Sequence, residues 1–245
     1  NDNSSRFGKF TKMLFGPAGA IEGAAVATYL LEKSRLVTHA PGERGYHVFY
    51  ELCAGANKQQ QEQLKLLPAR EYPFLFCDPE KEKARPTDDK EDAAHFEELM
   101  GSLAACGMAE AIVTQTLQVL AGLLALSRVS FVESADSDGS QLAGAAEEEA
   151  LRQAATVMGL AGESLLKVTT SRSLSTGRKA EIEEISVQLN EVQATQTRDS
   201  IAKMVYAKTF NWLVERINES LAQDETRDTH AFIGILDIYG FEVFQ

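Results

Sequence analysis

The last apolar stretch of the chain ends at a carboxylate. Gly234–Asp237 reads GILD, and Gly240 follows three residues later. A strand that ends in Asp presents its carboxylate at the edge of a sheet, where it can orient Mg²⁺ or a water bound to that ion. Gly240 lets a backbone N–H approach a phosphate because no Cβ lies in the way. The alternative is a core strand that simply ends at an Asp, and this stretch alone does not separate the two.

The start of the chain is a cluster of polar side chains. Its first six residues hold an amide, two hydroxyls and a guanidinium, from Asn1, Ser4, Ser5 and Arg6. A hydroxyl can ligate Mg²⁺, and the backbone N–H groups of such a turn can hold phosphate oxygens. The alternative is a polar turn with an arginine at the surface, and it stays open for this cluster alone.

Considered together, the two ends are more specific. NDNSSRFGKF (residues 1–10) and LDIYGFEVF (residues 236–244) resemble switch I and switch II of myosin motors. Kinesins share NxxSSR, but they follow it with Ser-His and carry DLAGSE in place of DIYGFE. Phe7, Gly8 and Phe241 therefore favour myosin over a kinesin-like microtubule motor.

The interior resembles the same family in the same order. YLLEKSRLV (29–37) is similar to YLLEKSRVV, and GERGYHVFYEL (42–52) to GERNFHIFYQL, with Gly45 in place of Asn. Residues 193–218 are similar to QAxxxRDALAKxLYxRLFxWLVxxIN. The stretch LALSRVSF (124–131) replaces the usual LHLGNIxF, so the myosin class stays open.

The resemblance implies a site for ATP and Mg²⁺. It implies that Asn1 contacts the phosphates, that Ser4 lies beside the γ-phosphate and the attacking water, and that Ser5 gives its hydroxyl to Mg²⁺. It also implies that Asp237 holds a water of the Mg²⁺ shell and that Gly240 donates its backbone N–H to the γ-phosphate. Hydrolysis of this kind needs positioning and charge stabilisation more than covalent chemistry.

An ion pair is expected to close this site. The resemblance implies that Arg6 pairs with Glu242, 236 positions further along the chain. Such a pair forms only where the two motifs meet, so it can gate hydrolysis and couple phosphate release to movement. The expected catalytic group is therefore Ser4, Arg6, Gly240 and Glu242.

A charged loop at residues 171–189 resembles the surface that docks on F-actin in this family. Many myosins carry an acidic or phosphorylatable residue sixteen positions before the Asp of the RDxxAK motif, and counting back from Asp199 gives Glu183. The adjacent Glu184 leaves this register open by one residue, and a solvated charged hairpin is the alternative. The candidate actin contacts are Arg178, Lys179 and Glu183. A second acidic loop, at residues 130–144, is expected to be solvated.

Strands and helices must position these motifs. Alternation predicts a strand at 9–15, followed by a turn at 16–19. Residues 20–35 fit either a strand or a helix, and β-branched and aromatic residues favour a strand paired back through the turn. Helices are predicted in six stretches: from residue 42 onward, at 57–67, at 88–100, at 109–126, from residue 147 onward, and at 190–222. The helical pattern is broken again from residue 171. The segment 78–92 is predicted as a charged loop, and residues 231–236 as a buried apolar strand.

Composition limits the classes of protein. The chain has 245 residues, 44% of them hydrophobic, and a formal net charge of −12. Such a charge argues against nucleic-acid or anionic-membrane binding, which needs basic surface. Three scattered cysteines without CxxC fit a reduced cytosolic protein, each as a small core residue. There is no secretory signal, and the apolar run at 112–126 is expected to be too short and too polar to span a bilayer.

These features predict an α/β motor fold of the P-loop NTPase type, of which this chain forms a part. It begins with Asn and contains no GxxxxGK[ST], so the P-loop, converter and lever arm are expected outside it. The chain itself is expected to be mainly helical, forming the upper actin-binding subdomain with switch strands at both ends. The predicted function is a cytoplasmic, ATP-driven motor on actin, with light chains and cargo bound elsewhere and no ATP turnover by this chain alone. The alternative is a non-hydrolysing actin-binding scaffold.

Overall fold

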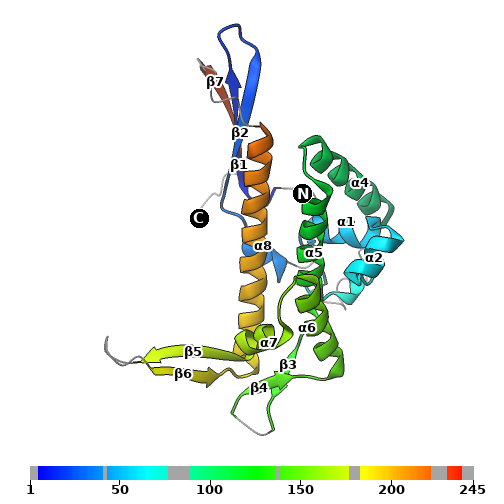
Figure 1. Ribbon diagram of the computed structural model, residues 1–245, viewed down its shortest axis with the longest axis vertical. Coiled ribbons are helices and arrows are strands. Elements are labelled where there is room, and N and C mark those ends of the chain that lie inside the picture. Colours follow the sequence, from blue (N-terminus) through cyan, green and yellow to red (C-terminus); the bar gives the residue numbers. More distant parts are fainter. Residues whose placement is uncertain are drawn as a thin grey trace.

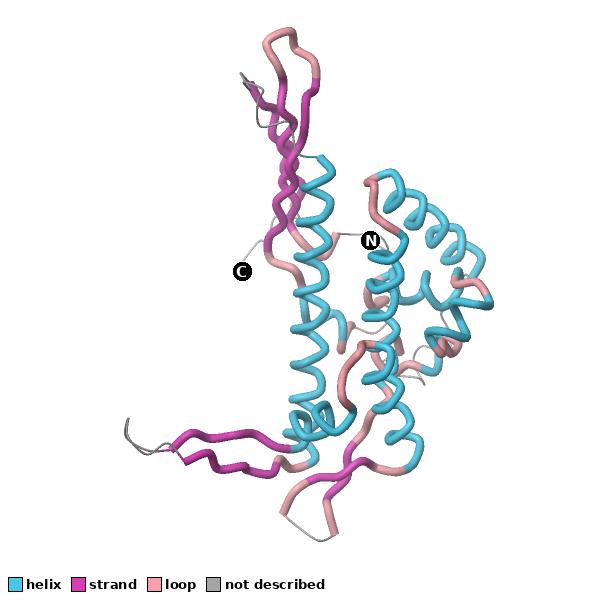
Figure 2. Tube along the Cα trace, viewed as in Figure 1, coloured by secondary structure: helices cyan, strands magenta, loops and turns pink. Residues whose placement is uncertain are grey.

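One long helix organises the chain (Figures 1 and 2). The computed structural model describes residues 5–40, 43–76, 89–135, 138–176, 183–221 and 231–238. Helix α8 (Glu191–Leu221) has 31 residues, which makes it about 46 Å long at 1.5 Å per residue. A β-sheet lies beside its C-terminal half, a β-hairpin projects near its N-terminal end, and the other helices gather along one side.

The sheet has three antiparallel strands in the order β2-β1-β7. The central strand β1 (Gly8–Phe15) lies between β2 (Ile21–Tyr29) and β7 (Ala231–Asp237). The strand alternative for residues 20–35 is therefore confirmed for 21–29, whereas a 3₁₀ turn begins at Lys33. Helix α8 holds β2 through Asn218, whose side chain accepts from the Val26 N–H at 2.7 Å and donates to the Val26 carbonyl at 2.8 Å.

The helical part surrounds the apolar core. Its elements are the 3₁₀ turns η1 (Lys33–Leu36) and η2 (Ala69–Glu71), and the helices α1 (His47–Gly55), α2 (Lys58–Leu64), α4 (Asp89–Ala105), α5 (Glu110–Ser127), α6 (Ala145–Val157) and α7 (Gly162–Thr170). The largest fully buried side chains include Phe49 and Leu52 of α1, Tyr72 after η2, and Leu123 and Leu124 of α5. The helical spacing of aromatic residues from Tyr46 onward therefore marked the buried face correctly.

Two predicted boundaries are wrong. Helix α2 ends at Leu64, before the predicted residue 67, because Lys65 adopts a left-handed conformation with φ of 51°. Helix α4 begins at Asp89, close to the predicted start at residue 88, but it runs to Ala105, beyond the predicted end at residue 100. Its first turn carries three carboxylates near the positive end of the helix dipole, as expected. Residues 78–88 of the predicted loop 78–92 lie outside the described residues.

Two antiparallel strand pairs lie in stretches that the first interpretation treated as loops. The acidic loop at 130–144 contains strands β3 (Phe131–Glu133) and β4 (Ser140–Leu142). Strands of three residues are too short to show alternation, and the buried Phe131 anchors this pair on the core. In the charged segment 171–189, strands β5 (Ser171–Thr176) and β6 (Glu183–Gln188) pair antiparallel, which agrees with the hairpin alternative for this segment.

Strand β7 exists as predicted, but the prediction that it is buried is wrong. All its residues are exposed, including Phe232, Ile233, Ile235 and Leu236, each more than half exposed. A continuous apolar run is typical of a strand covered on both faces. Here β7 is an edge strand whose one partner among the described strands is β1.

Helix α5 corrects the expectation about the apolar run at 112–126. The helix has 18 residues and a mean hydropathy of 1.3, so by length and composition alone it could cross a membrane. Half of it is buried inside the protein, mainly from Leu117 onward. It packs against α6 and α8, as the core helix of a folded domain does.

Candidate functional site

The sheet brings the two sequence motifs to the same place. In its register, Gly8 pairs with Tyr29, and Lys9 pairs with Asp237. Strand β1, which continues from the motif at residues 1–10, thus begins beside the end of β7, which leads into the motif at residues 236–244. We call this the motif end of the sheet: the end at which β1 begins and β2 and β7 finish.

Gly8 lies between Tyr29 and Ile238 at the motif end. A Cβ on this glycine would lie 3.4 Å from the Ile238 side chain and 3.6 Å from the Tyr29 side chain. The preceding residue, Phe7, packs edge-on against Phe210 of α8 with ring centroids 4.8 Å apart. Aromatic packing of this kind fixes the direction of the backbone that leads into the motif.

Asp237 has a cationic neighbour that the sequence did not reveal. Its carboxylate lies 3.9 Å from the Lys9 ammonium, and both side chains are about half exposed. The two residues are opposite each other in the β1–β7 ladder, so they form a cross-strand charge pair. Only the register could have disclosed this contact, because 228 positions separate the two residues.

Arg6 lies against the chain that follows β2. Its guanidinium Nη1 is 3.8 Å from a carboxylate oxygen of Glu32, and its side chain is 16% exposed. The Glu32 backbone N–H also donates to the Arg6 carbonyl at 2.9 Å. Glu32 is thus a second residue that reasoning from sequence missed. The one indication in the sequence was that Glu32 lies in the family-like stretch YLLEKSRLV.

Several predicted residues lie outside the described part of the chain. These are Asn1, Ser4, Arg178, Lys179, Gly240 and Glu242. The predicted pair between Arg6 and Glu242 therefore stays a prediction. Among the predicted nucleotide residues that are described, Ser5 is exposed and Asp237 ends β7.

The donors at the motif end fit a magnesium nucleotide in their chemistry. Mg²⁺ prefers oxygen ligands and keeps several of its waters, so one hydroxyl and one carboxylate acting through water suit it. Ser5 and Asp237 are both exposed and lie beside the start of β1 and the end of β7, respectively. Within the described ranges, no group of three or more His, Cys, Asp or Glu side chains could hold a metal by itself.

The hairpin with Glu183 lies far from the motif end. It projects near the N-terminal end of α8, whereas the sheet lies beside the C-terminal half (Figure 1). In the hairpin, Glu183 pairs with Thr176, and Glu184 pairs with Ser175.

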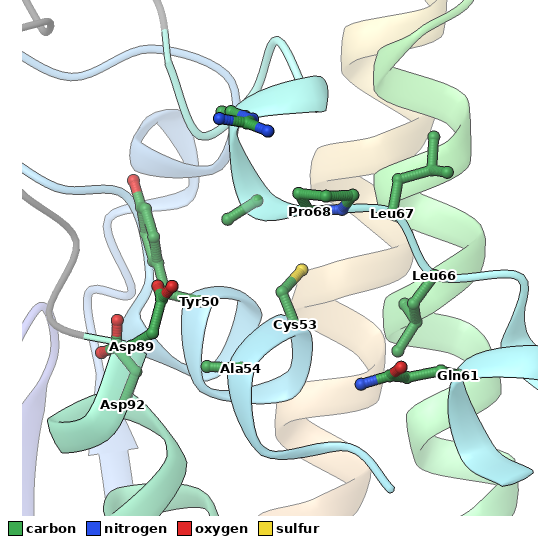
Figure 3. A pocket seen from close by; sticks show the side chains of 11 residues that line it. Tyr50, Cys53, Ala54, Gln61, Leu66, Leu67, Pro68, Asp89 and Asp92 are labelled. Atoms are coloured by element: carbon green, nitrogen blue, oxygen red, sulfur yellow. The ribbon is translucent and has the colours of Figure 1, made fainter. Parts of the chain in front are cut away.

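A cavity of about 490 Å³ lies away from both places, between α1, α2, η2 and the start of α4. Figure 3 shows Cys53 on one wall, with Asp89 and Asp92 on another. Burial raises the pKa of the Cys53 thiol to about 12. Because the thiolate is the reactive form, this cysteine has the character of a core residue, as predicted.

Cys53 is accordingly expected to resist alkylation. At pH 8, the maleimide labelling of a Cys53→Ser variant should match that of the unchanged protein, because a thiol with a pKa of about 12 is almost wholly protonated there. Mass spectrometry of the labelled peptides measures this. Rapid modification of Cys53 in the native protein would contradict the assignment.

Known proteins are similar to this chain over its whole length. The family model "Myosin head (motor domain)" matches residues 1–245. Unconventional myosin-Ia of Rattus norvegicus is 37% identical over 246 residues, which cover 100% of this chain and 28% of that protein. For unconventional myosin-Ia of Gallus gallus the identity is 38% over 245 residues, covering 100% of this chain and 23% of that protein. Myosin-4 of Arabidopsis thaliana is 40% identical over 245 residues, covering 100% of this chain and 20% of that protein. This chain thus spans less than a third of the length of these relatives, and over its whole length it belongs to the myosin head family.

Proposed function

We propose that this chain is part of a motor that moves on actin filaments and is driven by ATP hydrolysis. The observation that carries the proposal is the pairing of Lys9 with Asp237, which brings the first and second motifs to one end of a sheet. Residues 1–10 would be switch I and residues 237–242 switch II. Family membership supports the same function.

The motif end would bind Mg²⁺ and ATP. Ser5 would offer its hydroxyl to the ion, and Asp237 would hold one of the waters around it. Asn1, Ser4 and the Gly240 N–H would surround the phosphates. The bound ion would neutralise charge on the phosphate oxygens. Lys9, 3.9 Å from Asp237, would orient that carboxylate.

Arg6 and Glu242 would close the site. Arg6 lies at the start of the central strand, and Glu242 follows β7 in sequence. An ion pair between them would exclude water other than the attacking one and would make hydrolysis depend on the approach of the two switches.

The fold that fits this function is an α/β motor of the P-loop NTPase type. The sheet β2-β1-β7 would belong to its nucleotide-binding sheet, and the helices around α5 and α8 to the upper actin-binding subdomain. The phosphate-binding loop, converter and lever arm would come from other parts of the full-length protein, as would the sites for light chains and cargo. We place the motor in the cytoplasm on the actin cytoskeleton, without a transmembrane segment and without nucleic-acid binding.

Actin-activated ATPase activity of the full-length protein is the direct test. A rise in turnover on addition of F-actin supports the motor. Binding to F-actin without hydrolysis would instead indicate a scaffold built on a myosin-like fold. The 245-residue chain alone is expected to be inactive, because the loop that cradles the phosphates is not among its residues.

The hairpin β5–β6 would be a contact surface for actin. It projects from the body of the protein, as a docking element must (Figure 2). The basic residues Arg178 and Lys179 lie between its strands in sequence, and Glu183 begins β6. A fixed carboxylate at Glu183 would let the motor engage actin without phosphorylation.

Replacing Glu183 by Ala in the full-length protein should lower the actin-activated turnover severalfold and leave the turnover without actin unchanged. Glu184→Ala is the matched control, because it removes the same charge one position further along β6. Steady-state ATPase rates over a range of F-actin concentrations measure both variants. A normal Glu183→Ala variant would reject the assignment, and an effect of Glu184→Ala alone would move the register by one residue.

A further inference from the structure

Helix α8 is anchored in the helical part of the protein and reaches the sheet with its C-terminal half (Figure 1). Tyr206, in the middle of the helix, is buried and stacks on Tyr46, with ring centroids 4.5 Å apart. Closer to the N-terminal end, Arg198 donates to the Val129 carbonyl. The helix therefore has a position of its own, which the core sets and not the sheet.

The sheet, by contrast, has no buried residue in its three described strands β1, β2 and β7. Strands without a packed face depend on the helix that they contact. Two directional contacts within the described residues join this sheet to α8. Phe210 packs edge-on against Phe7, with ring centroids 4.8 Å apart, and Asn218 binds Val26 of β2.

Asn218 takes the place of a neighbouring strand at the outer edge of β2. Its Oδ1 accepts from the Val26 N–H at 2.7 Å, and its Nδ2 donates to the Val26 carbonyl at 2.8 Å. In an antiparallel ladder the N–H and the carbonyl of one residue point to the same side, so those of Val26 point away from its β1 partner, Thr11. The carboxamide of Asn218 offers one acceptor and one donor group, as a residue of a further strand would. A slide of β2 by one residue along α8 would turn the backbone groups away and break both bonds.

The β1–β2 ladder carries this constraint to the first motif. Val26 lies three residues before Tyr29, which pairs with Gly8 at the motif end. This separation is about 10 Å along the strand. Because β1 and β2 are paired from the motif end to the turn, a shift of β2 on α8 would move the start of β1 with it. Phe7 would then lose its place on Phe210.

We propose that Asn218 is a positioning residue for the nucleotide site: through Val26 it holds the start of β1, and with it Ser5, at a fixed place on α8. The proposal rests on the function proposed above. Ser5 is exposed and precedes β1 by three residues, so its place depends on that strand. Without the Asn218 carboxamide, the β1–β2 pair shifts on the helix, and Ser5 leaves the position from which it would bind Mg²⁺. The magnesium nucleotide then dissociates faster.

The test compares Asn218→Ala with Asn211→Ala in the full-length protein. Asn211 is an exposed asparagine of the same helix, so both variants change the helix propensity equally. Stopped flow with a fluorescent ADP analogue and Mg²⁺ measures nucleotide dissociation. Asn218→Ala should speed dissociation about threefold to tenfold, the equilibrium factor of one net hydrogen bond, and Asn211→Ala should leave it unchanged. Amide hydrogen exchange of Asn218→Ala should show lost protection at Val26 and unchanged protection in α1 and α4, which a general loss of stability would not produce.

A double variant separates positioning from two independent structural roles. Phe210→Leu loosens the contact with Phe7, and Phe210 lies eight residues before Asn218, about 12 Å along the helix. Independent effects at this distance add in free energy, so their factors multiply. If both contacts hold the start of β1, Phe210→Leu should speed dissociation by a smaller factor in the Asn218→Ala background than in the unchanged protein.

The inference fails on any of three results. Unchanged dissociation in Asn218→Ala would mean that the two hydrogen bonds do not position the site, whatever the exchange at Val26. An equal effect of Asn211→Ala, or lost protection in α1 and α4, would mean a general disturbance of the fold. Factors that multiply in the double variant would mean that the two contacts act independently. Failure of the unchanged full-length protein to bind the nucleotide is a different outcome: it would refute the proposed function, and this inference with it.

Discussion

Reversing the charge of Arg6, by Arg6→Glu in the full-length protein, should abolish ATP hydrolysis with little loss of ATP binding. The variant places a carboxylate where a cation is needed to meet Glu242, and it also removes the guanidinium that lies 3.8 Å from the Glu32 carboxylate. Removing one preorganised electrostatic contact from an active site commonly costs about 100-fold to 1,000-fold in rate. Phosphate burst kinetics measure hydrolysis, and a fluorescent ATP analogue measures binding. Glu242→Arg should have the same effect.

The charge-swapped double variant, Arg6→Glu with Glu242→Arg, should recover part of the hydrolysis. Recovery is incomplete because the new glutamate at position 6 still lies beside Glu32, whose carboxylate would repel it. Lys12→Glu is a suitable control, since it reverses a charge on the same strand away from the motif end. Full steady-state activity in either single variant would remove the closing role from this pair.

The contacts at the motif end show where reasoning from sequence stops. Both motifs could be recognised from the sequence alone, and the alternation of apolar and polar residues at 9–15 clearly predicted a strand. The pair Lys9–Asp237 depends on the antiparallel register, and a shift of one residue would separate it. Glu32 was hidden for a related reason: its role comes from its position after β2, next to Arg6, and glutamate at a strand end is otherwise an ordinary surface residue.

The wrong predictions have separate physical causes. Strand β7 was predicted as buried because its apolar run resembles a central strand, yet burial depends on what covers the sheet. The hairpin β3–β4 was missed because three-residue strands have no measurable period. Helix α8, by contrast, was predicted almost to its ends, because 31 residues give a helical pattern many turns in which to appear.

Gly55 should be intolerant of even a methyl group, and this second large effect concerns stability. It is the last residue of α1, where that helix crosses α4. An added Cβ would lie 2.4 Å from Phe96 Cβ and 2.7 Å from its ring. Phe96 cannot avoid the clash by changing rotamer, since its Cβ is fixed to the backbone of α4. The two helices must therefore separate, and overpacking of this kind typically costs about 1–3 kcal/mol.

Gly101→Ala provides the opposite case within the same pair of helices. Gly101 lies in the interior of α4, and a Cβ there meets nothing within 4 Å. Alanine in an exposed helix interior stabilises the helix by roughly 0.5–1 kcal/mol relative to glycine. Amide hydrogen exchange of α1 and α4 in the full-length protein reports local opening. Gly55→Ala should speed exchange in both helices by a factor of roughly 5 to 150, because each tenfold change corresponds to about 1.4 kcal/mol. Gly101→Ala should slow exchange in α4. Equal protection in the two variants would contradict the close packing of α1 on α4. The orientation of the GERGYHVFYEL segment depends on this packing, and so does the hydrogen bond from Tyr46 to Glu32.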